Sequence, residues 1–266
     1  MGIAFSDERA SRYMWAHKLS PDARSAERTA IVNLLRAMDL PPTASVVDLG
    51  SGHGFVTDAL VDALPHTTKI TAVEASEDML DGAAVHSGVE YRNTPLHMTG
   101  LPSESIDLVV SLAAFHHVPN KTITLAEIHR ILRRGGQVVI ADVEHGTRTQ
   151  RFFDEIVAKY SSTGHDFDFV DPDMMANFAR RAGLTHVASY ASQTDWQFET
   201  TDSLVAFVTN LLSLEMDADT LLDALKSILG ITRSRWGQYV LGWDLTFHVL
   251  VKLQPPVLPP TSVGRS

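Results

Sequence analysis

A short apolar run, Ser45–Leu49, leads directly into glycines at every second position, Gly50, Gly52 and Gly54, and a helical pattern begins at Phe55. Glycine lets the backbone turn tightly and lets a ligand approach the main chain. The first turn of the following helix presents unpaired N–H groups. This order predicts a buried strand, a ligand-binding turn and a helix.

The alternation of strands and helices continues to residue 143. Apolar runs predict strands over residues 45–49, 69–74, 89–92, 106–111 and 137–143, with helices over 55–64, 77–84 and 122–132 between them. The pair Gly135–Gly136 is expected to close the last of these helices. Strands that alternate with helices of this length form βαβ units and a parallel sheet. The fold class is therefore α/β.

The flanking segments are mostly helical. Residues 5–40 contain two helical stretches that end at Pro41–Pro42. After Gly146 the patterns predict helices over 149–161, 172–182, 202–213 and 218–229, and strands over 185–193 and 239–252. The proline-rich residues 254–266 have no apolar period and are expected to be a disordered tail.

Composition excludes several classes of protein. The 266 residues include 32 acidic and 22 basic ones, and a net charge of −10 disfavours nucleic acid and anionic membranes as partners. Cysteine is absent, which rules out disulfides, a cysteine nucleophile and cysteine-ligated zinc. The polar start, Met1–Ser11, lacks the apolar core of a signal peptide, and no apolar run of about 18 residues occurs. We expect a cytoplasmic protein.

Two acidic residues at strand ends restrict the class of ligand that the turn can bind. A dinucleotide fold requires G-x-G-x-x-G, but Phe55 occupies the place of the third glycine. Asp48, before the turn, repels a pyrophosphate and suits a cationic ligand. Glu74 ends the next strand, 20 residues after Gly54, where a carboxylate can accept hydrogen bonds from both ribose hydroxyls. S-adenosylmethionine fits this pattern, because it carries an ammonium and a sulfonium and no phosphate.

Residues 45–143 resemble the core of the class I S-adenosylmethionine-dependent methyltransferases. The branch most similar to the chain contains the ubiquinone and menaquinone C-methyltransferases and many natural-product methyltransferases. The resemblance is carried, in order, by the segments VVDLGSGHG, TAVEASEDML, LPSESIDLVVSLAAFHHVPN and EIHRILRRGGQVVIADV. It implies a Rossmann-like, seven-stranded, mostly parallel sheet with an antiparallel last strand. Helices would cover both faces, with extra helices in the C-terminal part.

The resemblance also implies further contacts with the cofactor. Met79 would pack on the adenine, and Ser111 would lie near the methionine part. His97 and Met98 align with a position that usually carries an acidic residue near the adenine amine. The expected cofactor-binding residues are Asp48, Gly50, Ser51, Gly52, Gly54, Glu74, Ala75, Met79, His97, Met98 and Ser111.

The acceptor side is expected at the ends of the fourth and fifth strands. His116 or His117, with Asp142, forms a general-base arrangement, because a carboxylate orients an imidazole and raises its basicity. In the alternative, His117 caps the strand and only His116 touches solvent. Tyr13 and Trp15 lie in an N-terminal helix that covers the cofactor in relatives, and they are candidate substrate contacts.

The chain is expected to be one domain over residues 1–253. Lid helices would occupy 1–40, the cofactor-binding core 45–143 and the acceptor-side elements 147–238. The acidic run that contains Asp166, Asp168, Asp171 and Asp173 lacks the central glycine and distal glutamate of a calcium loop. An aspartate N-cap before Pro172 is expected there instead, and no metal.

The expected function is methyl transfer from S-adenosylmethionine to a small molecule in secondary or cofactor metabolism. Three alternatives stay open: another use of the same cofactor, such as intramolecular attack on the sulfonium's own carbons; a nicotinamide dehydrogenase; and a protein that binds the cofactor without chemistry. The sequence does not indicate the acceptor or the oligomeric state.

Overall fold

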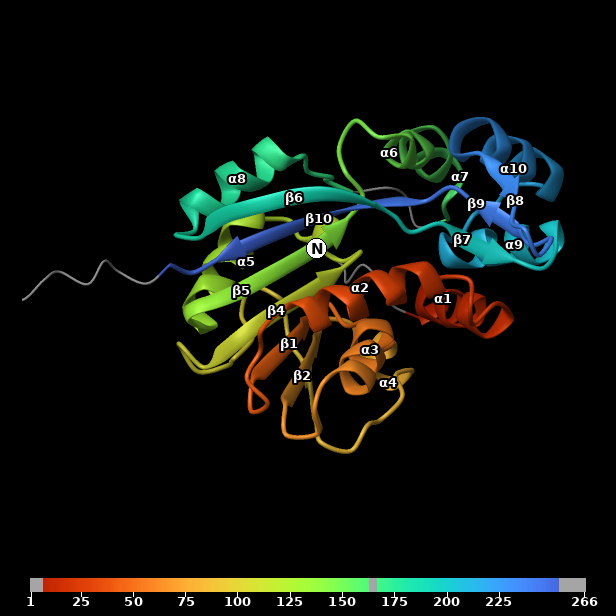
Figure 1. Ribbon diagram of the computed structural model, residues 1–266. Coiled ribbons are helices and arrows are strands. Elements are labelled where there is room, and N and C mark those ends of the chain that lie inside the picture. Colours follow the sequence, from red (N-terminus) through yellow and green to blue (C-terminus); the bar gives the residue numbers. More distant parts are fainter. Residues whose placement is uncertain (1–6, 163–166, 254–266) are drawn as a thin grey trace, which may run out of the picture.

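The computed structural model describes residues 7–162 and 167–253, so the proline-rich tail lies outside the described residues. A seven-stranded sheet forms its centre, in the order β3-β2-β1-β4-β5-β10-β6 (Figure 1). The strands are β1 Ser45–Leu49, β2 Lys69–Glu74, β3 Val89–Asn93, β4 Ile106–Leu112, β5 Leu132–Asp142, β6 Thr185–Gln193 and β10 Asp244–Val251. Strands β1 to β5 run parallel, and β10 is antiparallel to both β5 and β6. This confirms the expected seven-stranded, mostly parallel sheet with an antiparallel last strand.

Helices cover both faces of this sheet. They are α1 Asp7–Leu19, α2 Ser25–Ala37, α3 Phe55–Ala63, α4 Glu77–Asp81, α5 Lys121–Ile131, α6 Arg148–Phe152, α7 Ala158–Tyr160, α8 Pro172–Arg181, α9 Thr201–Leu211 and α10 Ala218–Ala224. On β1, Val46 belongs to the apolar cluster that contains Leu60 of α3. Its neighbour Val47 belongs to the cluster that contains Ile128 of α5 and Met175 of α8. Because both faces are buried, these strands are continuous apolar runs in the sequence.

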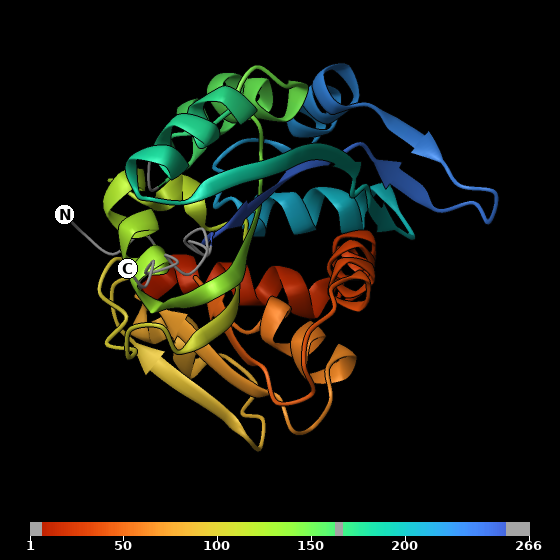
Figure 2. The ribbon, with the colours of Figure 1, turned by 60° about the vertical axis from the view of Figure 1, so that its left-hand side comes forward.

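A second, three-stranded sheet lies at the end toward which the arrowheads of β4 and β5 point (Figure 1). Its strands are β7 Trp196–Phe198, β8 Ile231–Arg233 and β9 Tyr239–Leu241, all antiparallel. The β8–β9 hairpin extends away from the body of the molecule (Figure 2). We call residues 196–241, which contain α9, α10 and this sheet, the cap. No sequence pattern predicts β7 or β8.

The prediction of one strand over 239–252 is wrong, because the chain divides between the two sheets at Gly242. A Cβ at Gly242 would lie 2.6 Å from the Leu229 carbonyl oxygen, so no side chain fits there. The amide of Gly242 donates to the carbonyl of Gly230 at 3.0 Å. This contact ends β9 in the cap, and β10 begins two residues later in the main sheet.

The prediction that Gly135–Gly136 closes a helix is also wrong. Helix α5 ends at Ile131, and β5 begins at the next residue. Within β5, the amide of Gly135 donates to the Lys252 carbonyl at 2.7 Å, and the Lys252 amide donates to the Gly136 carbonyl at 3.0 Å. The glycine pair therefore pairs with the chain beyond β10, a partner that local sequence does not reveal.

Helix α1 bridges the cap and the cofactor half of the molecule. The Arg12 guanidinium donates to the carbonyls of Thr209 and Leu214 at 3.2 Å, where α9 ends. On its other side, the Met14 sulfur occupies the space that a side chain at Gly82 would need. Gly82 follows α4 and has a right-handed backbone with φ −81°. A side chain at position 82 would therefore require the Met14 side chain to move, whereas the backbone of residue 82 itself does not favour glycine.

A buried ion pair joins α2 to the cap. The Arg24 and Glu27 side chains are 6% and 0% exposed, and they pair with each other. The Trp196 indole N–H donates to Glu27 Oε1 at 2.6 Å, and Arg24 donates to the Tyr13 hydroxyl at 3.0 Å. Helices α1 and α2 and strand β7 thus share one buried hydrogen-bond network.

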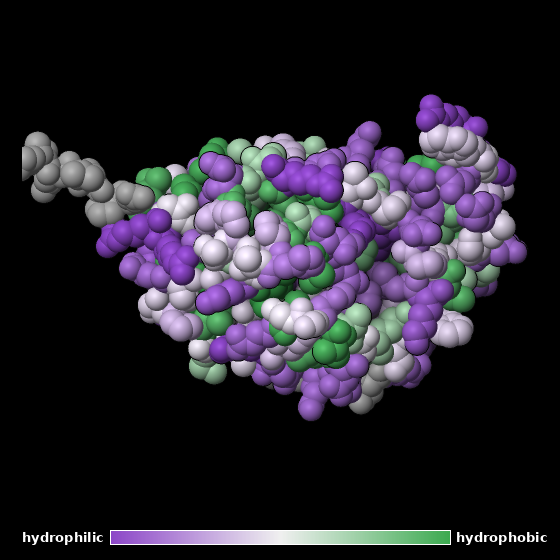
Figure 3. Space-filling model, turned by 60° about the horizontal axis from the view of Figure 1, so that its bottom comes forward, coloured by the Kyte–Doolittle hydropathy of each residue, from purple (hydrophilic) through white to green (hydrophobic). Residues whose placement is uncertain are grey.

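The surface carries polar and apolar side chains in mixture. On the face in Figure 3, the apolar side chains of the described residues appear between polar ones and do not gather into one large patch. Across residues 7–162 and 167–253, no helix combines the length and apolarity that a membrane span requires.

Candidate cofactor and acceptor site

The glycine turn between β1 and α3 has a backbone that requires glycine and little space for a side chain at Gly50 and Gly52. Gly50, Gly52 and Gly54 have φ of 81°, 54° and 101°, which is the region that favours glycine. A Cβ at Gly50 would lie 2.5 Å from the Ala114 Cβ, and one at Gly52 would lie 3.2 Å from the Met79 methyl group. The turn therefore presents bare backbone at the carboxyl end of β1.

Asp48 lies beneath this turn, fully buried. Its Oδ2 accepts a hydrogen bond from the Thr57 hydroxyl at 2.7 Å, and its Oδ1 has no partner among the described residues. Burial, with the nearby carboxylates of Glu74 and Asp58, raises the pKa of Asp48 to about 7, although the hydrogen bonds from Thr57 act in the opposite direction. A cationic group near Oδ1 would stabilise the ionised carboxylate.

Glu74, at the end of β2, is held against the turn. Its Oε2 accepts from the Gly52 amide at 2.9 Å, and its Oε1 accepts from the Ser76 amide at 2.8 Å. Burial raises the pKa of Glu74, while hydrogen bonds from the amides of Ser76, Gly52 and Ala75 act in the opposite direction. Each oxygen keeps a lone pair, so the carboxylate can accept two further hydrogen bonds.

Two serine hydroxyls complete this polar group. Ser51 in the turn and Ser111 on β4 are buried, and neither Oγ finds a hydrogen-bond partner in the part of the chain that the structure describes. Strand β4 lies beside β1, and Val110 pairs with Asp48. Unsatisfied buried polar atoms destabilise a fold unless a ligand or solvent pairs with them. Asp48 Oδ1 and the two hydroxyls therefore fit the amino-acid part of S-adenosylmethionine.

The expected adenine contacts divide into two groups. Met79 is buried against Gly52, as a residue that packs on a bound ring requires. His97 and Met98 are exposed, Met98 to 63%. Leu96 was not predicted, and its Cδ1 lies 3.5 Å from a Cβ placed at Gly50. It was missed because a single leucine in a loop carries no motif.

His116 and Asp142, which were predicted for the acceptor side, lie in contact. Asp142 Oδ1 lies 2.7 Å from His116 Nδ1, and Oδ2 accepts from the His116 amide at 2.9 Å. Both residues are buried, at 8% and 2% exposure. Since the carboxylate occupies Nδ1, Nε2 is the nitrogen that can take a proton.

His117 lies beside this pair. The two imidazole centroids are 4.1 Å apart, and His117 is the more exposed ring. The alternative in which only His116 touches solvent is therefore reversed. Phe167 packs edge-on against both imidazoles, at 5.0 Å from His116 and 4.8 Å from His117.

The candidate substrate contacts in α1 have different surroundings. The Tyr13 ring lies 5.3 Å from the imidazole of His53, which belongs to the glycine turn. Trp15 is 54% exposed. His53 also packs against His17 at 4.3 Å, and burial lowers the pKa of His53 to about 4 and that of His17 to about 2. Sequence reasoning missed His53 because it fills a variable position between the glycines.

The acidic run has the structural role that was predicted for part of it. Asp171 is the N-cap of α8 and accepts from the Met174 amide at 2.7 Å, with Pro172 at the first helical position. Asp166 lies outside the described residues. Within the described ranges, no three residues of the types His, Asp and Glu group closely enough to hold a metal ion.

Comparison with known proteins agrees with this geometry. Residues 47–140 match the family described as "Methyltransferase domain". Over 150 residues the chain is 28% identical to the ubiquinone biosynthesis O-methyltransferase of Aromatoleum aromaticum, a match that covers 52% of this chain and 63% of the relative.

Solved structures of other methyltransferases share the fold. The Haemonchus contortus phosphoethanolamine N-methyltransferase 2 in complex with S-adenosyl-L-methionine has a TM-score of 0.58 at 16% identity, over 92% of this chain and 57% of that chain. A geranyl diphosphate methyltransferase in complex with sinefungin has a TM-score of 0.55 at 13% identity, over 86% and 79%.

Residues 47–140 thus form a class I S-adenosylmethionine-dependent methyltransferase domain. The chain as a whole spans less than two thirds of the curated relative's length. The family match does not favour the dehydrogenase alternative.

Proposed function

We propose that this chain transfers the methyl group of S-adenosylmethionine to a hydroxyl or amine of a small molecule. The bound cofactor supplies a methyl group that its sulfonium already activates. The observation that carries the proposal is the set of buried polar atoms without partners among the described residues, Asp48 Oδ1, Ser51 Oγ and Ser111 Oγ, at and beside the glycine turn.

Each group has a role that follows from its surroundings. Asp48, Ser51 and Ser111 bind the amino-acid part, and Glu74 accepts hydrogen bonds from the two ribose hydroxyls. Because Glu74 is already fixed by two backbone amides, it needs little reordering to do so. The first role of these residues is to position the methyl group for in-line attack, since positioning supplies much of the rate in such reactions.

His116 acts as the general base on the acceptor. Asp142 fixes the ring through Nδ1, so Nε2 removes the proton from the attacking hydroxyl or amine. The resulting imidazolium is stabilised by the buried carboxylate 2.7 Å away. The rings of Phe153, Phe167 and Phe169 lie 5.0 to 6.5 Å from that imidazole, which suits an acceptor with an apolar body.

The remaining assignments follow from the same arrangement. Helix α1, with Tyr13 against the glycine turn, covers the cofactor, and Trp15 contributes to acceptor binding at its outer side. Residues 147–238 supply the rest of the acceptor side within the domain 1–253. The setting is the cytoplasm, and the partner is a small molecule such as a phenol or an amine.

Replacing His116 with alanine tests the base assignment. A positioned base contributes roughly 10²–10⁴-fold to rate, so turnover should fall by that factor while S-adenosylhomocysteine affinity stays the same. His117→Ala should lower turnover less, because Asp142 orients the imidazole of His116. His66, an exposed histidine before β2, is the matched control, and His66→Ala should change neither quantity.

Three results would contradict the proposal. If His116→Ala slows turnover only a few-fold, catalysis proceeds by proximity alone and His116 is structural. Product formation without any added acceptor would favour intramolecular use of the sulfonium. Cofactor binding without turnover across hydroxyl and amine acceptors would favour a binding protein.

A further inference from the structure

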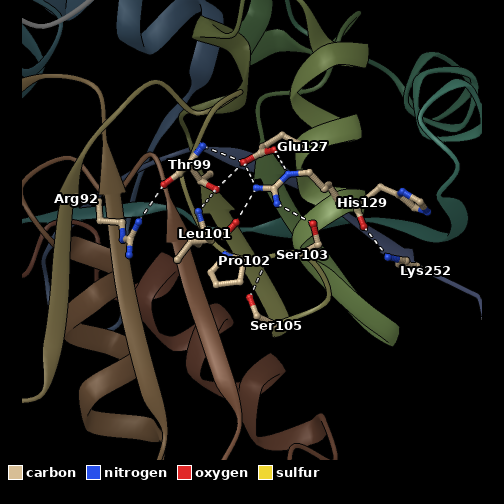
Figure 4. A network of polar contacts seen from close by, with 10 residues as sticks. Arg92, Thr99, Leu101, Pro102, Ser103, Ser105, Glu127, His129 and Lys252 are labelled. Carbon is tan, nitrogen blue, oxygen red and sulfur yellow. Dashed lines mark hydrogen bonds and ion pairs between the residues drawn. The ribbon is translucent and has the colours of Figure 1, made fainter.

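The loop between β3 and β4 is held by a single carboxylate from another element. Glu127 of α5 is nearly buried, with a side chain 10% exposed. Its Oε1 accepts from both the amide and the hydroxyl of Thr99, at 2.9 and 2.6 Å (Figure 4). Thr99 is fully buried, and its own hydroxyl accepts from the Leu101 amide at 3.3 Å.

Arg130, one turn further along α5, completes this clamp. Its Nε donates to Glu127 Oε2 at 2.7 Å, and its terminal nitrogens donate to the Leu101 carbonyl at 2.7 Å and to the Ser103 hydroxyl at 3.0 Å (Figure 4). The hydrogen bonds from Arg130 lower the pKa of Glu127, so the carboxylate is ionised near neutral pH. Ionised partners make the stronger kind of hydrogen bond.

The other end of the same loop is tied to the ribose-binding glutamate. The Asn93 side-chain amide and the Thr94 backbone amide both donate to the Glu74 carbonyl at 3.1 Å. Residues 94–99 are therefore anchored to Glu74 at one end and to Glu127 at the other. His97 and Met98 lie in this span, directly before Thr99, and both are exposed.

Few other contacts fix the exposed part of this span. The Met98 amide donates to the Pro95 carbonyl at 2.9 Å, which forms a local turn. Leu96 packs toward the glycine turn. Thr99 follows Met98 immediately, and the Arg92 guanidinium also donates to the Thr99 carbonyl, at 3.4 Å. The position of His97 and Met98 relative to the turn thus depends on the Thr99 anchor, in which Glu127 makes the two shorter hydrogen bonds.

We propose that Glu127, with Arg130, is a positioning residue for the adenine end of the cofactor site. It acts through Thr99 by holding the backbone of residues 96–99 beside the glycine turn, and it does not touch the cofactor. This rests on the cofactor placement proposed above.

The test compares binding of S-adenosylhomocysteine with binding of adenosine, which carries only the adenine and ribose. Glu127→Ala should weaken both about tenfold, because a charge-assisted anchor of this kind contributes roughly that much. The Km for S-adenosylmethionine should rise by the same factor, and kcat at saturation should stay within about twofold, because the reacting atoms lie at β4 and β5.

Two conservative variants separate positioning from folding. Glu127→Gln keeps an oxygen for Thr99 and should restore most of the affinity, leaving a loss of about two- to threefold. Thr99→Val removes the hydroxyl from the anchor at nearly constant shape and should weaken adenosine about threefold.

Asp107→Ala is the matched control. Asp107 pairs with Arg133 and accepts from the Ser45 amide at the start of β1, the opposite edge of the sheet. Its side chain is 19% exposed, close to that of Glu127. This variant should lower the melting temperature and leave both affinities unchanged.

The outcomes distinguish this proposal from the proposed function. If the wild-type chain binds neither ligand, the cofactor placement itself is wrong. If the wild-type chain binds both, and folded Glu127→Ala or Thr99→Val binds adenosine equally well, Glu127 is only structural. If Glu127→Ala does not fold, the adenosine affinity of Thr99→Val alone decides whether Glu127 positions the site or is only structural.

Discussion

The cofactor half, residues 45–143, and the cap, residues 196–241, are held together by contacts of different range. In the cofactor half, Thr57 bonds Asp48 nine residues away, and Gly52 bonds Glu74 at a separation of 22. At the cap, Trp196 bonds Glu27 across 169 residues. The first kind of contact leaves a local pattern in the sequence, and the second leaves none.

The two regions also use their polar groups differently. In the cofactor half, buried atoms without partners among the described residues occur on Asp48, Ser51, Thr94 and Ser111, whereas the cap has one, on Ser213. At the cap, Glu27 bonds both Arg24 and Trp196 through separate oxygens. The difference fits the ligand site proposed in the cofactor half, while the contacts of Glu27 fasten α2 to the cap.

The largest effect is expected where the two regions join. Glu27→Ala leaves the Arg24 guanidinium buried without its carboxylate, and breaking a buried pair in this way destabilises by about 3–5 kcal/mol. We expect the melting temperature to fall by about 10 °C in calorimetry, since 1 kcal/mol shifts a chain of this size by about 2–4 °C.

Glu155→Ala is the control for that variant, because Glu155 pairs with Arg151 on an exposed helix surface. It should leave the melting temperature nearly unchanged. Equal melting temperatures for the two variants would mean that the buried pair does not fasten the cap.

A smaller effect is expected inside the cofactor half. Glu74→Ala removes the acceptor for both ribose hydroxyls, and hydrogen bonds to a charged group contribute roughly 1.5–3 kcal/mol each. S-adenosylhomocysteine affinity should fall at least about tenfold in titration calorimetry. The matched change Glu77→Ala, at the exposed start of α4, should leave it intact. An unchanged dissociation constant in Glu74→Ala would place the ribose elsewhere.

The smallest effect is expected in the pH dependence of cofactor affinity. If the cofactor's ammonium requires ionised Asp48, whose pKa is about 7, affinity should fall about tenfold from pH 8 to pH 6. Close to one proton should be released on binding at pH 6, and calorimetry in buffers of different ionisation enthalpy measures it. Asp48→Asn should abolish this dependence. A wild-type affinity that does not vary with pH would show that Asp48 is already ionised.

The raised pKa of Asp48 also makes the stability of the unliganded fold depend on pH. Stability falls as the pH rises, whereas cofactor affinity should fall as the pH decreases. The folded chain binds this proton more tightly than the unfolded chain, whose aspartate pKa is near 3.8. The stability that the folded chain gains by holding this proton is therefore complete below pH 3.8, and it is lost as the pH rises toward about 7.

The range of these contacts also explains what the sequence could predict. The glycines, Asp48 and Glu74 were identified because each stands at a fixed place relative to a strand end. The His116–Asp142 contact was predicted because neighbouring parallel strands end at one edge. Leu96 and His53 were not identified, since their contacts depend on the path of a loop and on α1. Strands β7 and β8 were missed because three residues are too few for a pattern.

The contact of Met14 with Gly82 has a consequence for engineering. Exchanging the N-terminal helices for those of a relative with another acceptor is an obvious route to new specificity. In such a chimera residue 82 is best exchanged along with the helices, because the Met14 side chain of α1 fills the space beside Gly82. The chimera would also have to bring the Trp196 partner of Glu27. The exchangeable unit is therefore a set of three separate stretches of chain, and a crossover at residue 40 alone would break it.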